Sequence, residues 1–397
     1  MLYIGVSRIT ESPLNIIEMK RLCKDVDITD RGLISQAIYH CLQKKYKRND
    51  TIKFLSGFTV LTGDQVRYIL HRGGKTALRW IVERVIDTVR EEIINRNVTF
   101  PPIWYRTKVD GSSGKVRRIG IQNIKQQLYD YIAVEAMGPF WKRFGEYQYA
   151  SIKGRGTTKG MKVIRRWLQN TSLRYFVKLD VRRCFESIDH ERLMAFLRRH
   201  IKNEPLLWLV QVLINSFESG LSIGSYLSQY LCNAYMSIIY HRVKEDMYKM
   251  RRGARVNLIH RCMIYMDDIL LIGSRKRDVE KAIKNVITLA DDMGLEIKPN
   301  YQTKAIDGNC IDMLGFRVYR THIEIRKSIF VRVRRAYKKI RKAPTVRIAR
   351  KCISYYGYLK YSDSRRIEKR WKVKSAIRKC KGVIRGESKI FQPATAG

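Results

Sequence analysis

Apolar residues recur at three- to four-residue spacing through much of residues 1–95, and this spacing is the period of an amphipathic helix. One such stretch begins at residues 32–39, and a longer one covers residues 77–94. The segment 99–102 contains two prolines and interrupts the pattern. Residues 1–95 are therefore expected to form a mostly helical region.

The pattern changes from helix to strand beyond these prolines. Two strand-like runs, 104–109 and 116–121, flank a turn-forming cluster from Asp110 to Gly114, and together they predict a hairpin. Three further short apolar runs predict strands: 175–180, 261–264 and 269–272. Two other stretches have helical spacing: 126–137 and 278–293. Strands separated by helices predict an α+β sheet domain with helices on one face.

The sequence from Arg326 onward is densely basic, and its only acids are Asp363, Glu368 and Glu387. Aromatic residues alternate with the basic ones, and the apolar residues keep a helical spacing. A single run of charge is ordinarily a solvated helix surface. Charge so dominated by one sign instead favours contact with phosphates. We therefore expect a helical region with a cationic face.

The formal net charge of the 397 residues is +43, which is far from the ordinary balance. Such an excess favours a polyanionic partner, with nucleic acid expected and an anionic membrane surface as the alternative. No apolar run approaches the length that spans a bilayer, and residues 1–5 lack the features of a secretion signal. We expect a cytoplasmic protein that does not act at a membrane.

The eight cysteines lie far apart, without a Cys-x-x-Cys pair or a Cys/His cluster of zinc-binding spacing. Buried or free thiols in a reducing cytosol are the expected state. The spacing argues against a zinc-dependent nuclease in the C-terminal region.

Tyr265-Met266-Asp267-Asp268 lies between two of the predicted strands. Adjacent carboxylates on a tight turn repel each other and raise one pKa unless a cation compensates. Hard divalent ions such as Mg²⁺ supply that compensation and prefer carboxylate oxygens. An ordinary exposed turn is the alternative, but the apolar strands on both sides favour a metal site.

Asp180 ends another predicted strand and provides the second source of carboxylate. Two Mg²⁺ ions bridged by Asp180 and Asp267, with Mn²⁺ as a substitute, would activate a 3′-hydroxyl and stabilise a departing pyrophosphate. Asp268 is expected to be a weaker ligand, and the main-chain carbonyl of Val181 would complete the metal sphere. Asp189 is interpreted as a helix N-cap rather than a further ligand.

Three segments resemble the motifs of reverse transcriptases and occur in the order and rough spacing of that family. They are Tyr265-x-Asp267-Asp268, Leu179-Asp180-Val181-x-x-x-Phe185-x-x-Ile188-Asp189 and Leu314-Gly315-Phe316. The resemblance implies RNA-templated DNA synthesis, with Asp180, Asp267 and Asp268 as the catalytic residues.

The same resemblance implies a right-hand polymerase fold with fingers, a palm built on an antiparallel sheet, and a helical thumb. The expected boundaries place a helical N-terminal extension at 1–95 and the fingers at 96–172. The palm, with part of the fingers inserted, is expected at 173–322, and the basic helical thumb and tail at 323–397.

Contacts with the incoming deoxynucleoside triphosphate are also implied. Phe185 matches the family's aromatic steric gate, which would clash with a 2′-hydroxyl, and core packing is its alternative. Lys115 and Arg117 alternate on one face of a predicted strand, which suits a triphosphate contact. Two more cationic candidates, Lys153 and Arg155, lie among glycines that let backbone amides approach an anion. A third, Lys298, is expected near the leaving group.

The segment Ile223-Gly224-x-x-x-Ser228-Gln229 resembles reverse transcriptases of diversity-generating retroelements, whereas group II intron enzymes have Gln-Gly-x-x-x-Ser-Pro. The resemblance implies copying of a template-repeat RNA with errors opposite adenine, for mutagenic retrohoming. Gly224 would allow close approach to the nascent pair, and Gln229 is a further nucleotide-site candidate. Ile223 cannot form the hydrogen bond that glutamine could make.

The implied partners are template RNA, the RNA–cDNA duplex and an accessory protein oligomer docked on part of the basic surface. A bacterial cell or a phage-infected host is the expected setting. A group II intron-like or phage-defence reverse transcriptase is one alternative. A catalytically silent RNA-binding protein on a polymerase fold is another, and the three retained aspartates argue against it.

Overall fold

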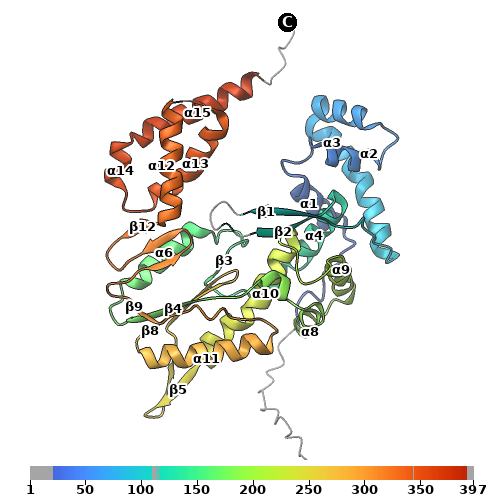
Figure 1. Cartoon of the computed structure of the whole chain (residues 1–397). Coiled ribbons are helices and arrows are strands. Elements are labelled where there is room, and N and C mark those ends of the chain that lie inside the picture. The colour runs from blue at the N-terminus through green and yellow to red at the C-terminus, as the bar shows by residue number, and fades with distance from the viewer. Residues whose placement is uncertain (1–20, 110–113, 115, 343, 391–397) are drawn as a thin grey trace, which may run out of the picture. The chain divides into compact units, whose positions relative to one another are not determined.

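A five-stranded sheet forms the centre of the larger of two compact units. The computed structural model describes residues 21–109, 114, 116–342 and 344–390. The sheet order is β3-β7-β8-β4-β9, and Figure 1 labels β3, β4, β8 and β9 of this sheet. Its strands are β3 (Gln148–Tyr149), β4 (Tyr175–Asp180), β7 (Arg261–Tyr265), β8 (Asp268–Gly273) and β9 (Lys304–Ala305). All neighbours are antiparallel except β3 and β7, and the three strands predicted from apolar runs are confirmed.

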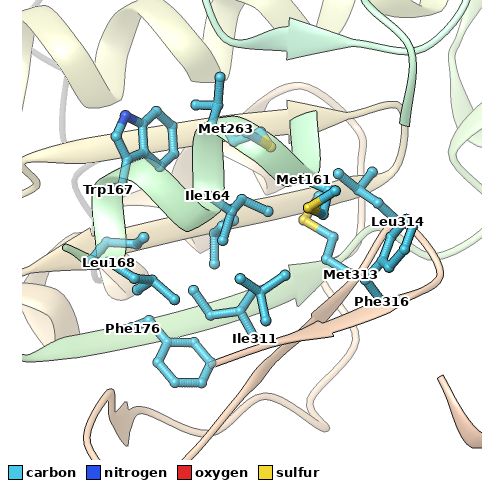
Figure 2. Packing of buried hydrophobic residues seen from close by; sticks show 14 of the residues in the cluster. Met161, Ile164, Trp167, Leu168, Phe176, Met263, Ile311, Met313, Leu314 and Phe316 are labelled. Carbon is cyan, nitrogen blue, oxygen red and sulfur yellow. The ribbon is translucent and has the colours of Figure 1, made fainter. Parts of the chain in front are cut away.

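Both faces of this sheet are covered, because side chains that point in opposite directions along β4 are buried. Phe176 faces one side, where α6 (Thr157–Leu168) contributes Met161, Ile164 and Trp167 to the apolar cluster of Figure 2. Val177 lies on the other side and is fully buried. Helices α10 (Tyr226–His241) and α11 (Lys276–Asp292) also contact the sheet. The expectation of helices on one face alone was therefore too simple.

A three-stranded sheet follows, made of β10 (Ile311–Met313), β11 (Phe316–Val318) and β12 (Ile323–Ile325). Gly315, in the β10–β11 turn, has a φ of +85°. A Cβ there would lie 2.7 Å from the Tyr358 ring, so both the backbone conformation and the space require glycine.

The C-terminal helices have a core of their own. They are α12 (Lys327–Lys342), α13 (Val346–Lys360), α14 (Arg365–Arg370) and α15 (Val373–Ile390). Val333, Tyr337, Cys352 and Val373 are buried in that core, while the lysines and arginines remain largely at the surface. The predicted basic helical region is confirmed.

Helices make up the smaller unit, which contains described residues from 21–101, 123–143 and 190–216. They are α1 (Arg31–Leu42), α2 (Asn49–Ser56), α3 (Gly63–Ile94), α4 (Ile124–Ala136), α5 (Gly138–Trp141), α8 (His190–His200) and α9 (Glu204–Asn215). A capping box between Thr62 and Gln65 begins the long α3. Lys125 of α4 donates to Glu92 of α3 at 2.6 Å. The N-terminal helices thus share a unit with helices from later in the chain.

Two hairpins complete the larger unit. β1 (Trp104–Val109) pairs with β2 (Val116–Ile121), as predicted, and most of the connecting turn lies outside the described residues. A second hairpin, β5 (Tyr248–Arg251) with β6 (Ala254–Asn257), was not predicted and follows the π-helical turn η1 (Arg242–Asp246). All eight cysteines are free, and seven are buried. Within the described part of the chain, no helix is long and apolar enough to cross a membrane.

Candidate active site

The β7–β8 hairpin presents the paired aspartates. Tyr265 pairs with Asp268, so Met266 and Asp267 form a two-residue turn. Met266 has a φ of +53° and is 8% exposed. Positive φ suits two-residue hairpin turns because it matches the strand twist, although it is uncommon for a residue with a side chain. The turn therefore buries the Met266 side chain and leaves Asp267 at the tip.

Asp180 lies directly opposite Asp268 on the neighbouring strand. The turn is joined to the end of β4, because the Val181 N–H donates to the Asp267 carbonyl at 3.0 Å. The Lys298 N–H donates to the Asp180 carbonyl at 2.9 Å on the other side of β4. The backbone thus places three carboxylates at one end of the sheet.

Two lysines neutralise two of these carboxylates. Lys178 Nζ lies 2.8 Å from Asp268 Oδ1, and Lys298 Nζ forms an ion pair with Asp180. All four side chains are between 24% and 30% exposed. Opposed like charges on neighbouring strands destabilise a sheet, and the lysines offset that effect. Sequence reasoning did not include Lys178, although its position two residues before Asp180 places it on the same strand face.

Asp267 is the exception, since no cation among the described residues forms an ion pair with it. Its pKa is raised, first by the partial loss of water around the carboxyl group and then by the negative charge of Asp268. The charge of Asp180 acts in the same direction, and Lys298 opposes it. A bound cation would relieve this electrostatic penalty.

The donor chemistry fits a hard divalent cation, because the carboxylates supply only oxygen atoms. Within the described residues, no three His, Cys, Asp or Glu side chains converge as a metal centre. Lysines hold two of the carboxylates instead. Three features together support a cation site at this end of the sheet. The carboxylates offer oxygen donors, they lie close together, and the negative charge of Asp267 has no ion-pair partner among the described residues.

Phe185 lies on the single turn α7 (Cys184–Ser187), five residues after Asp180. Its side chain is partly exposed, so it is not simply a core residue. The Leu221 N–H donates to the Phe185 carbonyl at 2.7 Å. Gly220, at a φ of +56°, packs so closely that a Cβ would lie 2.4 Å from the Glu186 carbonyl oxygen. These contacts hold the backbone beneath the aromatic ring.

Residues 150–156 form a loop with an unusual backbone. Ala150, Ser151 and Gly154 have φ values of +76°, +51° and +75°. Arg155 donates through Nη1 to the Gly145 carbonyl at 2.5 Å. The Lys153 side chain is exposed. Arg155 therefore holds the loop together, whereas Lys153 has the accessibility that a triphosphate contact requires.

Gln229 joins this loop to the segment at Ile223. Its Nε2 donates to the Ile223 carbonyl at 3.1 Å, and its Oε1 accepts from Ser151 Oγ at 3.0 Å. One turn later, Asn233 Nδ2 donates to the Ala150 carbonyl at 3.0 Å. Sequence reasoning singled out Gln229 but not Ser151 or Asn233, since those partners are distant in the chain.

The β1–β2 hairpin packs against the same segment. A Cβ on Gly224 would lie 2.0 Å from the Gly120 carbonyl oxygen, so only glycine fits. Arg118 donates to both Glu218 carboxylate oxygens, at 2.7 and 3.0 Å. Arg117 is exposed on β2, and Lys115 lies outside the described residues. The structure thus gives Gly224 a packing role, while its contact with a nascent pair stays a prediction.

A family model described as reverse transcriptase (RNA-dependent DNA polymerase) matches residues 107–318. That segment contains the three aspartates and the residues that surround them. The chain belongs to the reverse transcriptase family. Together with the sheet, the hairpins and the C-terminal helices, this match confirms the expected α+β polymerase-like fold. The match does not distinguish subfamilies of reverse transcriptase.

Among solved structures, this reverse transcriptase is similar to an apo telomerase from Candida tropicalis that was truncated from its C-terminal domain. The TM-score is 0.41 and the sequence identity is 13%, over 57% of this chain and 55% of that chain. The chain thus spans about half the length of that structure. A comparison with curated proteins gives no match.

Proposed function

We propose that this reverse transcriptase copies the template-repeat RNA of a diversity-generating retroelement into cDNA, with errors opposite adenine, for mutagenic retrohoming. The observation that carries the subclass is the segment Ile223-Gly224-x-x-x-Ser228-Gln229. Within the proposal, residues 1–95 are an N-terminal extension and 96–172 the fingers. Residues 173–322 are the palm, and 323–397 are the basic thumb and tail.

Asp180, Asp267 and Asp268 are proposed to be the catalytic residues. Asp180 and Asp267 would hold two Mg²⁺ ions, or Mn²⁺ in their place, with Asp268 as a weaker ligand and the Val181 carbonyl completing the sphere. When bound, such ions would lower the pKa of a primer 3′-hydroxyl and neutralise the departing pyrophosphate. Lys298 is proposed to lie near the leaving group, and its ion pair with Asp180 supports a position beside the proposed metal ligands.

Selection of the nucleotide is proposed to use a steric and a cationic contact. The partly exposed Phe185 ring would lie beneath the sugar and exclude a 2′-hydroxyl. The exposed Lys153 and Arg117 would contact the triphosphate, and Lys115, which lies outside the described residues, stays a further candidate. Arg155 would act indirectly, because its guanidinium group already holds the loop that carries Lys153.

The error rate is proposed to depend on Ile223. An isoleucine cannot donate a hydrogen bond to the nascent pair or its template, so discrimination between pairs would rest on shape alone. Gln229 would act through Ile223, since both ends of its amide group bond to protein atoms. Gly224 would keep the segment against β2, as its contact with Gly120 indicates.

Primer extension on an RNA template rich in adenine tests the subclass. Ile223→Gln should lower misincorporation opposite adenine while leaving incorporation opposite other template bases unchanged. Ile223→Leu is the matched control, because it keeps an apolar side chain, and it should retain the wild-type error rate. If the wild type copies adenine as accurately as the other bases, the group II intron-like or phage-defence alternative is favoured.

The implied partners are part of the proposal. Template RNA and the RNA–cDNA duplex would bind the basic surface, and an accessory protein oligomer would dock on another part of it. The formal net charge of +43 supports polyanion binding in general. Co-purification of a defined accessory protein in the absence of RNA would separate the protein contact from the RNA contact.

A further inference from the structure

A cavity of about 470 Å³ lies where α6 meets the C-terminal helices. Lys162 and Arg165 of α6 line one side. Lys360, at the end of α13, and the following Tyr361 line another, and Arg365 of α14 adds a further cation. The cavity is distinct from the end of the sheet that carries the three aspartates, and none of its cationic residues has been assigned a role above.

Two ammonium groups lie near one aromatic ring in this cavity. Lys162 Nζ lies 5.1 Å and Lys360 Nζ 5.5 Å from the centroid of the Tyr361 ring. Among the residues that the structure describes, neither ammonium group has a carboxylate within ion-pair distance. A cation–π contact compensates each of these positive charges only in part, so the lining of this cavity favours an anion.

Three other charged residues of the cavity already have structural partners: Asp363, Glu368 and Arg165. Asp363 accepts from the Ile323 N–H at 2.7 Å, and Ser364 Oγ donates to Glu368 at 3.4 Å. Arg165 donates to the backbone carbonyls of Tyr319 and Thr321 at 3.1 and 2.7 Å. Two acids remain in the lining, but cationic side chains outnumber them. Lys162, Lys360 and Arg365 are the cations that are exposed to a ligand.

We propose that this cavity binds a backbone phosphate of RNA, with Lys162 and Lys360 as its direct ligands and Arg365 beside them. The assignment of the phosphate to RNA rests on the proposed function, whereas the anion site itself rests on the contacts described above. Exposed lysines suit a polymer that approaches from solvent. The basic surface continues along α14 through the exposed Lys369 and Arg370, as a backbone of repeating phosphates requires.

The site would have a structural consequence for the active site. Helix α6 begins directly after the loop that Arg155 and Gln229 hold, and its apolar face packs on the catalytic sheet (Figure 2). Lys360 belongs to the C-terminal helices. Tyr361 already packs against the apolar cluster of the sheet, and a phosphate shared by Lys162 and Lys360 would add a second link between those helices and α6 when RNA is bound.

Binding of a fluorescent RNA–DNA hybrid to the full chain, measured over a series of KCl concentrations without nucleotides, tests this proposal. The double variant Lys162→Gln/Lys360→Gln should reduce the slope of log K against log salt by about one, because each neutralised phosphate contributes about 0.7–0.9. Lys281→Gln/Lys284→Gln on the exposed face of α11 removes the same charge and should leave the slope close to that of the wild type. Equal slopes for the two double variants would overturn the proposal.

A second arm distinguishes RNA from a free anion. Thermal unfolding with inorganic phosphate or pyrophosphate should show the same small shift in the wild type and in Lys162→Gln/Lys360→Gln. A shift confined to the wild type, combined with an unchanged RNA slope, would identify a free-anion site and overturn the assignment to RNA. Because this binding assay involves no polymerisation, an inactive wild type would contradict the proposed function and leave the phosphate site standing.

Discussion

The end of the sheet that carries the three aspartates and the α6–α13 cavity hold lysines in opposite ways. At the sheet, Lys178 and Lys298 each face a carboxylate, and Asp267 forms no ion pair with any residue that the structure describes. In the cavity, Lys162 and Lys360 face an aromatic ring, and the charges without partners are positive. The comparison teaches that a side-chain charge without a partner in the fold indicates a ligand of the opposite sign. The ligand is then a cation at the sheet and an anion in the cavity.

The largest expected effect comes from Asp267→Asn. Primer extension should fall at least about 100-fold, because the variant loses a cation ligand. Its free energy of unfolding should equal or exceed that of the wild type. A carboxyl group whose pKa is raised by folding destabilises the fold in its ionised form, so its removal relieves that effect above the pKa.

Asp291→Asn on the exposed end of α11 is the control and should keep wild-type activity. Activity equal to the wild type in Asp267→Asn would contradict the catalytic assignment and would favour a catalytically silent RNA-binding protein.

Addition of Mg²⁺ should stabilise the wild type but not Asp267→Asn. At ten times its dissociation constant the ion should raise the free energy of unfolding by about 1.4 kcal/mol, because it binds the folded state alone. Thermal unfolding with and without the ion, and after chelation, measures the effect. Equal stabilisation of both proteins would show that the cation binds elsewhere and would contradict the cation site at the end of the sheet.

Lys298→Gln should lower the free energy of unfolding by about 1 kcal/mol, because it leaves the half-buried Asp180 without its ion pair. Mg²⁺ should restore much of the loss, since the ion compensates the same carboxylate. Denaturant unfolding with and without Mg²⁺ measures both values, with Lys284→Gln as the exposed control. A loss that Mg²⁺ leaves unchanged would argue for a purely structural role of Lys298.

The smallest effect on stability is expected in the cavity. Lys162→Gln/Lys360→Gln removes cations that have no carboxylate partner in the described part of the chain, so the free energy of unfolding should change by less than about 0.5 kcal/mol. The same denaturant assay as for Lys298→Gln gives a direct comparison. A loss as large as that of Lys298→Gln would show that the fold balances these lysines by contacts of its own.

Local patterns predicted the strands around the aspartates correctly, because a strand buried on both faces has a short apolar sequence with few alternatives. The β1–β2 hairpin was predicted for a similar reason, since its turn residues lie together in the sequence. The β5–β6 hairpin was missed because its strands, Tyr248–Arg251 and Ala254–Asn257, are only four residues long. Apolar and polar residues alternate in both strands, but so short an alternation is a weak signal.

Partners that are distant in the chain were beyond prediction. Gln229 was expected to contact a nucleotide, and nothing in its neighbourhood indicates that its amide group bonds to Ser151, 78 residues earlier. Lys298 was expected near the leaving group, which stays a prediction, and its ion pair with Asp180, 118 residues earlier, was not foreseen. The grouping of α4, α8 and α9 with the N-terminal helices depends equally on contacts between separate parts of the chain.

The sequence alone determined the candidate catalytic and binding residues of this protein: a pair of adjacent aspartates between apolar strands, a further aspartate at a strand end, and a strongly basic C-terminal region. These features are local, since each depends on neighbouring residues. The tertiary structure alone decided which charges are balanced. An ion pair such as Lys298–Asp180, or a shared ring such as Tyr361, exists only after folding brings distant side chains within a few ångströms. The Coulomb energy of two charges depends on the distance between them and on the surrounding water, and the amino-acid sequence gives neither quantity.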